Sequence, residues 1–94
     1  MTTNMIAVLI EKEQIPELNF KKNLEIDQAP DLMQQLMHAT RLGNIHHGKT
    51  RIEFLDDEGL KWVETTIWAT GAKFICLKGG VWLPISRING LKEL

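Results

Sequence analysis

The residues from Thr50 to Ile88 constrain the fold most strongly, because they contain four runs of β-type sequence and no stretch long enough for a separate helix. The runs are separated by Asp56–Gly59, by Gly71 and by Gly79-Gly80. Glycine and aspartate are residues that tight turns favour. We therefore expect a mainly β fold of short, tightly connected strands, and we interpret the acidic Asp56–Gly59 segment as a solvated hairpin turn.

The second run, Leu60 to Thr70, is long for a strand and has apolar residues on both faces. On a strand, Val63 and Ile67 lie on one face, whereas Trp62 and Trp68 lie on the other. A strand with this pattern bends and contributes to two sides of a closed or half-closed sheet. The sequence thus predicts strong curvature within this run.

The end of the chain continues the β pattern after a short interruption. In Val81 to Ile85, Pro84 cannot donate a ladder hydrogen bond, so we place it at an edge or a bulge. Ser86-Arg87-Ile88 is expected to form a short helical turn, and a brief final segment with Leu91 and Leu94 follows. Residues 50–94 are therefore predicted to form a small five-stranded barrel.

One helix is predicted before the barrel, over residues 30–42. Pro30 suits a first helical turn, Asp31 places negative charge at the positive end of the dipole, and Gly43 offers a left-handed stop. Gly43 to Gly48 is then expected to be a loop. The side chains expected on the buried stripe are Leu32, Met33, Leu36, Met37 and Thr40. Flexible methionines there suit an irregular barrel mouth.

The first 28 residues form an N-terminal extension that is harder to assign. Met5 to Ile10 is an apolar run of strand length, although Thr3 could cap a short helix through the same residues. Ile15, Leu18 and Phe20 alternate imperfectly around Pro16. We favour an N-terminal strand, or a hairpin whose second strand lies at an edge.

Composition indicates one globular domain over residues 1–94, since 44% of the residues are hydrophobic and 24% are charged. The single cysteine, Cys76, excludes an intrachain disulfide, and we expect a reducing, cytoplasmic location. No apolar run is long enough to span a membrane, so we expect no membrane partner. The net charge of −1 lacks the electrostatic signature of a dedicated nucleic-acid binder.

The layout of a helix followed by five short, curved strands resembles the Sm-like small barrels. Two groups of bacterial proteins are similar in more detail. An uncharacterised small-barrel family carries a pattern like VETTIWA…KFICLKGGV…PI, here Val63 to Ile85. The Rof family of Rho-termination inhibitors has a comparable helix, acidic-glycine turn and terminal Arg-Ile pair, here Arg87-Ile88. The first resemblance brings no function with it, and the second concerns mainly the layout.

Catalytic, cofactor and metal sites are not indicated by the sequence. His38, His46 and His47 cluster near the predicted helix end, but no cysteine or carboxylate joins them at a recognisable ligand spacing. Cys76 alternates with apolar residues, as a small buried hydrophobe does. We therefore expect a protein that is not an enzyme and that uses no cofactor.

The three tryptophans are the candidate interaction residues. Trp62, Trp68 and Trp82 fall opposite the aliphatic faces of their strands, and they either fill the space under the helix or form an exposed platform. The basic residues that could flank such a platform are Lys61, Lys73, Lys78 and Arg87. A protein partner is our leading hypothesis. Binding of RNA by an Sm-like regulatory protein is the alternative, and self-association through strand edges is the third.

Overall fold

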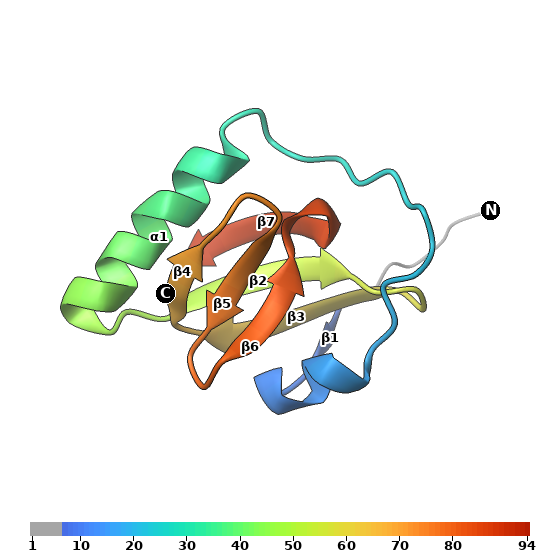
Figure 1. The fold of residues 1–94 in the computed structure, drawn as a ribbon, viewed down its shortest axis with the longest axis horizontal. Helices are drawn as coiled ribbons and strands as arrows, with labels where there is room; N and C mark the ends of the chain where they lie inside the picture. Colours follow the sequence, from blue (N-terminus) through green and yellow to red (C-terminus); the bar gives the residue numbers. More distant parts are fainter. Residues whose placement is uncertain (1–6) are drawn as a thin grey trace.

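The structure is a computed structural model that describes residues 7–94. These residues form one α-helix, two 3-10 helices and seven strands, coloured from blue to red along the chain in Figure 1. The elements are β1 (Val8–Leu9), η1 (Lys12–Glu17), α1 (Leu32–His46), β2 (Thr50–Leu55), β3 (Leu60–Thr65), β4 (Ile67–Thr70), β5 (Phe74–Leu77), β6 (Val81–Pro84), η2 (Ile85–Arg87) and β7 (Ile88–Glu93). The mainly β class with one helix is confirmed.

The strands form two sheets, with the orders β1-β3-β2-β7 and β4-β5-β6. Only Thr66 separates β3 from β4, so the run from Leu60 to Thr70 passes from one sheet into the other. The predicted bend is therefore confirmed. Within residues 7–94 the hydrogen-bonded ladders do not close into a barrel. No helix in this part of the chain has both the length and the apolar character that crossing a membrane requires.

The core lies between the two sheets and α1. In β2, Thr50, Ile52 and Phe54 are buried, whereas the residues between them are partly exposed, as alternation along a half-buried strand requires. The buried cluster comprises Ile15, Leu32, Leu36, Ala39, Ile52, Phe54, Val63, Ile67, Ile75, Leu77, Leu83, Ile85 and Ile88. One cluster therefore draws on η1, α1, η2 and six of the strands, β2 to β7.

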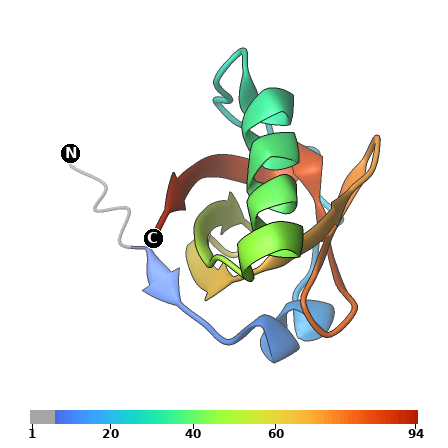
Figure 2. The ribbon, with the colours of Figure 1, turned by 90° about the vertical axis from the view of Figure 1, so that its left-hand side faces the viewer.

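Helix α1 runs four residues beyond its predicted end and packs against β4 (Figure 2). Gly43 is a buried helical residue and not a stop, and the left-handed position belongs to His47, with φ of 54°. A Cβ atom on Gly43 would lie 2.7 Å from the carbonyl oxygen of Ile67 and 2.8 Å from Cγ2 of Thr66. The glycine is needed for close approach of the helix to the bend, which explains why its role as a helix terminator was wrongly predicted.

The buried stripe of α1 also differs from the prediction. Leu32, Leu36, Ala39 and Gly43 are buried, at spacings of four, three and four residues. Met33 and Met37 are exposed, with 40% and 55% of their surface accessible. Small residues at 39 and 43 bring this line of the helix closest to the sheet, and the methionines are turned away from the core.

The N-terminal region contains a short strand, as favoured from the sequence, but it does not form the alternative hairpin. Val8 and Leu9 pair in parallel with Lys61 and Trp62, and Lys12–Glu17 is a 3-10 helix whose Ile15 is buried. Met5, and Thr3 with its alternative helix cap, lie outside the described residues. After η1 the chain runs without helix or strand over residues 19–28, here called the strap, before it reaches α1 (Figure 1).

Replacing Gly43 with alanine should destabilise the protein. Alanine gains about 1 kcal/mol of helix propensity over glycine, but overpacking against a backbone oxygen costs about 1 to 3 kcal/mol. Because the closest atom is a backbone oxygen, which cannot move aside as a side chain can, we expect a cost in the upper part of this range. The net loss in the free energy of unfolding should be about 1 to 2 kcal/mol, measured by urea denaturation. Asn44→Ala, at the next and exposed helical position, is the control and should not destabilise. An unchanged or higher stability of Gly43→Ala would contradict the close approach.

Candidate functional site

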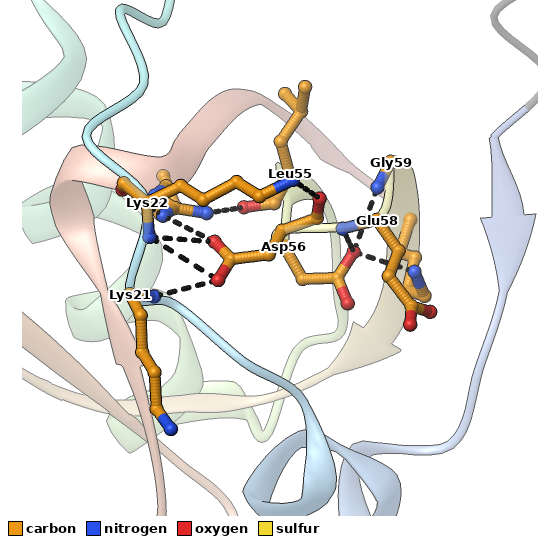
Figure 3. Close-up of polar contacts among 9 residues, drawn as sticks. Lys21, Lys22, Leu55, Asp56, Glu58 and Gly59 are labelled. Carbon is orange, nitrogen blue, oxygen red and sulfur yellow. Dashed lines mark hydrogen bonds and ion pairs between the residues drawn. The ribbon is translucent and has the colours of Figure 1, made fainter.

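Two of the seven predicted interaction residues, Lys61 and Arg87, instead hold the fold together. The Nζ atom of Lys61 lies 2.7 Å from Oδ1 of Asp56, a carboxylate that is almost fully buried. The same oxygen accepts hydrogen bonds from the backbone N–H groups of Glu58 and Gly59 (Figure 3). Asp56 thus fixes the turn between β2 and β3 from inside, and Lys61 neutralises it.

Arg87 ties the strap to the turn. Its guanidinium group donates to Oδ1 of Asp57 at 2.8 Å, to the carbonyl oxygen of Leu55 at 3.1 Å and to that of Lys22. Asp57 also accepts hydrogen bonds from the backbone N–H groups of Lys21 and Lys22. The interpretation of this acidic turn as solvated was therefore wrong for Asp56 and Asp57, and the partners of Arg87 are up to 65 residues away in sequence.

The carboxyl group of Asp57 stays ionised to lower pH than usual. Burial acts to raise the pKa of Asp57, but the hydrogen bond from Arg87 and those from the backbone of Lys21 and Lys22 outweigh this effect and lower the pKa. The ionised carboxylate therefore stabilises the folded state.

Trp62 does not join the other tryptophans. It lies on β3, where its ring is covered by the guanidinium group of Arg51 at 3.8 Å from the ring centroid. Arg51 also pairs with Glu53 at 3.1 Å. Around Trp62, the outer surface of β2 and β3 thus carries charged side chains, while β1 at the edge of the same sheet adds the exposed Val8 and Leu9.

The outer surface of the β4-β5-β6 sheet is different, because aromatic side chains lie exposed on it. Trp68, Phe74 and Trp82 have 45%, 47% and 59% of their surface accessible. The inner surface of the same strands carries the buried Ile67, Ile75, Leu77 and Leu83. We define the aromatic face as the outward residues Trp68, Ala69, Phe74, Cys76, Trp82 and Pro84.

The strand register shows how these residues come together. Cys76 lies opposite Trp82, and Phe74 lies opposite Pro84. On the other side of β5, Ala69 pairs with Cys76 next to a register shift between Ile67 and Ala69. Such a bulge turns two successive residues toward one surface, which accounts for the exposure of both Trp68 and Ala69. Phe74 was missed in the sequence, although its alternation with buried Ile75 and Leu77 was a usable signal.

Charge is distributed unevenly around the aromatic face. Four of the eleven basic residues and none of the twelve acidic residues lie between Glu64 and Glu93. Lys73 and Lys78 are exposed at the two ends of β5, and neither forms an ion pair with any residue in the range 7–94. Of the predicted basic residues, these two remain available to a partner.

A groove adjoins the aromatic face where β5 begins and β6 leads into η2. Its volume is about 470 Å³, and it is lined by Ala72, Lys73, Phe74, Pro84, Ile85 and Ser86. Phe74 and Pro84 belong to both surfaces, so the groove is an extension of the aromatic face.

Metal coordination finds no support in residues 7–94, where no three or more His, Cys, Asp or Glu side chains are grouped closely enough to hold an ion. Comparisons with known proteins give no further indication. No family model, curated protein or solved structure matches this chain.

Replacing Asp57 with asparagine should loosen the strap. Both carboxylate oxygens of Asp57 accept hydrogen bonds, whereas an amide is uncharged and has a single accepting oxygen. Because the folded-state pKa is lowered, the stabilisation is present above the unfolded pKa of about 3.9 and is lost as pH falls through the folded value. Wild type should be the more stable at neutral pH, and the difference should shrink below about pH 4.

Urea denaturation at a series of pH values measures this difference, with Glu58→Gln as the control that removes a neighbouring exposed carboxylate. If the free energies of unfolding of wild type and Asp57→Asn differ by a constant amount down to the lowest pH, the role of the ionised carboxylate is contradicted.

Proposed function

We propose that this chain is a non-enzymatic protein-interaction module that binds its partner through the aromatic face. The observation that carries the proposal is the exposure of Trp68, Phe74 and Trp82 on one rigid sheet surface. Adjacent exposed apolar groups on a folded chain mark interaction sites, and tryptophan is enriched among residues that dominate binding energy.

The backbone beneath the aromatic face supports this function. The inward residues of β4, β5 and β6 are anchored in the core, and both strand pairs are hydrogen bonded along their length. The aromatic side chains therefore project from a scaffold that is already ordered before binding. A preorganised surface loses less conformational entropy on association than a flexible one.

The barrel interpretation forms part of the same proposal. If β3 and β4 are counted as one strand bent at Thr66, five strands follow α1, and η2 precedes the last of them. We propose a half-closed variant of the Sm-like layout on this basis, related to the families that the Val63 to Ile85 pattern and the Arg87-Ile88 pair resemble. We also propose a reducing, cytoplasmic location, which the single cysteine supports.

RNA binding is the second candidate, supported by exposed rings and by the absence of acidic residues between Glu64 and Glu93. Of the four predicted basic residues, Lys61 and Arg87 are engaged by Asp56 and Asp57, which leaves Lys73 and Lys78 for phosphates. Two phosphate contacts give a salt slope of only about −1.4 for a single strand. This number of contacts favours a protein partner over RNA.

Serine substitutions at Trp68 and Trp82 test the proposal. Both side chains are about half exposed, so each substitution should change the free energy of unfolding by less than about 1 kcal/mol. Partners captured from cells by tagged wild-type protein and identified by mass spectrometry should be lost from both variants, with a fall in affinity of about tenfold or more.

Ile45→Ser is the matched control, because Ile45 is a large apolar residue that is 61% exposed at the end of α1. It should retain the captured partners. Retention of the same partners by Trp68→Ser and Trp82→Ser would contradict the proposal. Loss of cooperative unfolding in the two variants would show that the rings serve folding, and preferential capture of RNA would support the second candidate.

A further inference from the structure

We infer that the partner presents an apolar side chain flanked by carboxylates, and that the groove formed by Ala72, Lys73, Phe74, Pro84, Ile85 and Ser86 receives that side chain. This inference rests on the proposed function and deepens it by specifying the chemistry of the partner. The occupant is a short segment of another protein, in which Asp or Glu residues stand next to a Leu, Ile, Met or aromatic residue.

The walls of the groove suit an apolar side chain. Phe74, Pro84 and Ile85 contribute ring and aliphatic surface, and the volume of about 470 Å³ falls within the range of about 300 to 1,000 Å³ that binding pockets show. Burial of an apolar group there is favourable in proportion to the area removed from water. The groove therefore supplies an anchor site at the border of the aromatic face.

The backbone groups of Ile85 in the groove are already hydrogen bonded. The N–H group of Ile85 donates to the carbonyl oxygen of Lys73 at 2.9 Å, and the carbonyl oxygen of Ile85 accepts from Nε2 of Gln28 at 2.8 Å. These two groups are therefore satisfied, and the side chains that line the groove are the candidates for contact with a charged group. Lys73 is the charged residue among the six that line the groove, and Ser86 adds a hydroxyl group.

Charge complementarity indicates that the partner segment is negatively charged. The strands of the aromatic face carry no acidic residue, and Lys73 and Lys78 stand at opposite ends of β5. An apolar groove with one lysine at its rim discriminates by charge: a neighbouring carboxylate gains a charge-assisted contact, whereas a neighbouring lysine is repelled. A peptide carboxylate needs one cation, so this groove suits an acidic segment better than a polyphosphate backbone.

Peptide titration tests the inference directly. The probe is a pool of short synthetic peptides in which a central Leu, Ile, Met, Phe or Trp is flanked on both sides by two Asp residues. The control pool has Asn in place of every Asp. Amide resonances of isotopically labelled protein report binding, and those of Lys73, Phe74 and Ser86 should shift with the acidic pool at about tenfold lower concentration than with the neutral pool.

Charge reversal tests the role of the lysine. Lys73→Glu should weaken binding of the acidic pool by about tenfold or more, as loss of a contact to a charged group does. Lys49→Glu is the matched control, since it makes the same charge change at an exposed position before β2, and it should leave binding unchanged.

Equal binding of the two peptide pools, shifts confined to other surfaces, or an unaffected Lys73→Glu variant would each overturn the inference. So would tighter binding of single-stranded oligouridylate, or dimerisation of the chain through the groove. The inference and the proposed function can be distinguished. If native partners are lost from Trp82→Ser but kept by Lys73→Glu, the proposed function stands and only the acidic partner is overturned.

Discussion

The contact between α1 and the bend at Thr66 is the constraint on which the arrangement of the two sheets depends. The carbonyl oxygen of Thr66 accepts a hydrogen bond from the N–H group of Lys78 at 2.9 Å, and its hydroxyl group approaches the carbonyl oxygen of His47. Gly43 packs closely against Thr66 and Ile67. The helix end and the end of β5 thus hold the chain where it leaves one sheet for the other, which sets the direction of β4, β5 and β6.

The two sheets differ in how their outer surfaces meet solvent. On β2 and β3, outward positions carry Arg51, Glu53 and Glu64, and Trp62 is covered by a guanidinium group. On β4, β5 and β6 the outward positions carry aromatic and small apolar residues. Both sheets use their inner surfaces for one core, so the difference does not arise from folding. Under the function proposed above, partner binding would account for this difference.

Local patterns were sufficient to predict most of the β region. Alternation located the strands from Thr50 to Pro84, and apolar residues on both faces of Leu60 to Thr70 predicted the bend. These features depend on neighbours in sequence. The short helical turn near Arg87 was also anticipated, although it spans Ile85–Arg87 and so begins one residue earlier than predicted.

The errors concern contacts between distant residues. A glycine near the end of a helical pattern looks the same in the sequence whether it ends the helix or lies against another segment. The contact between Gly43 and Ile67, which is distant in sequence, shows that the second case applies. Lys61 and Arg87 looked available because Asp56 and the strap become their partners only in the folded chain. For the same reason, the sequence predicted that the three tryptophans lie on outward faces but did not show that these faces belong to different sheets. Trp62 lies in the β1-β3-β2-β7 sheet, whereas Trp68 and Trp82 lie in the β4-β5-β6 sheet.

The size of the aromatic face bears on the kind of association that it supports. Each of β4, β5 and β6 has four residues, which corresponds to a length of about 13 Å, and neighbouring strands are about 4.8 Å apart. A flat surface of these dimensions covers only about 200 Å², well below the about 800 Å² that each partner contributes to a standard interface, so an association centred on it is a weak or transient one. Affinity must then come from a few anchors such as Trp82, and discrimination from charge. The transient partner with a short acidic segment that we propose would meet both requirements, whereas a permanent subunit would need contacts well beyond this sheet.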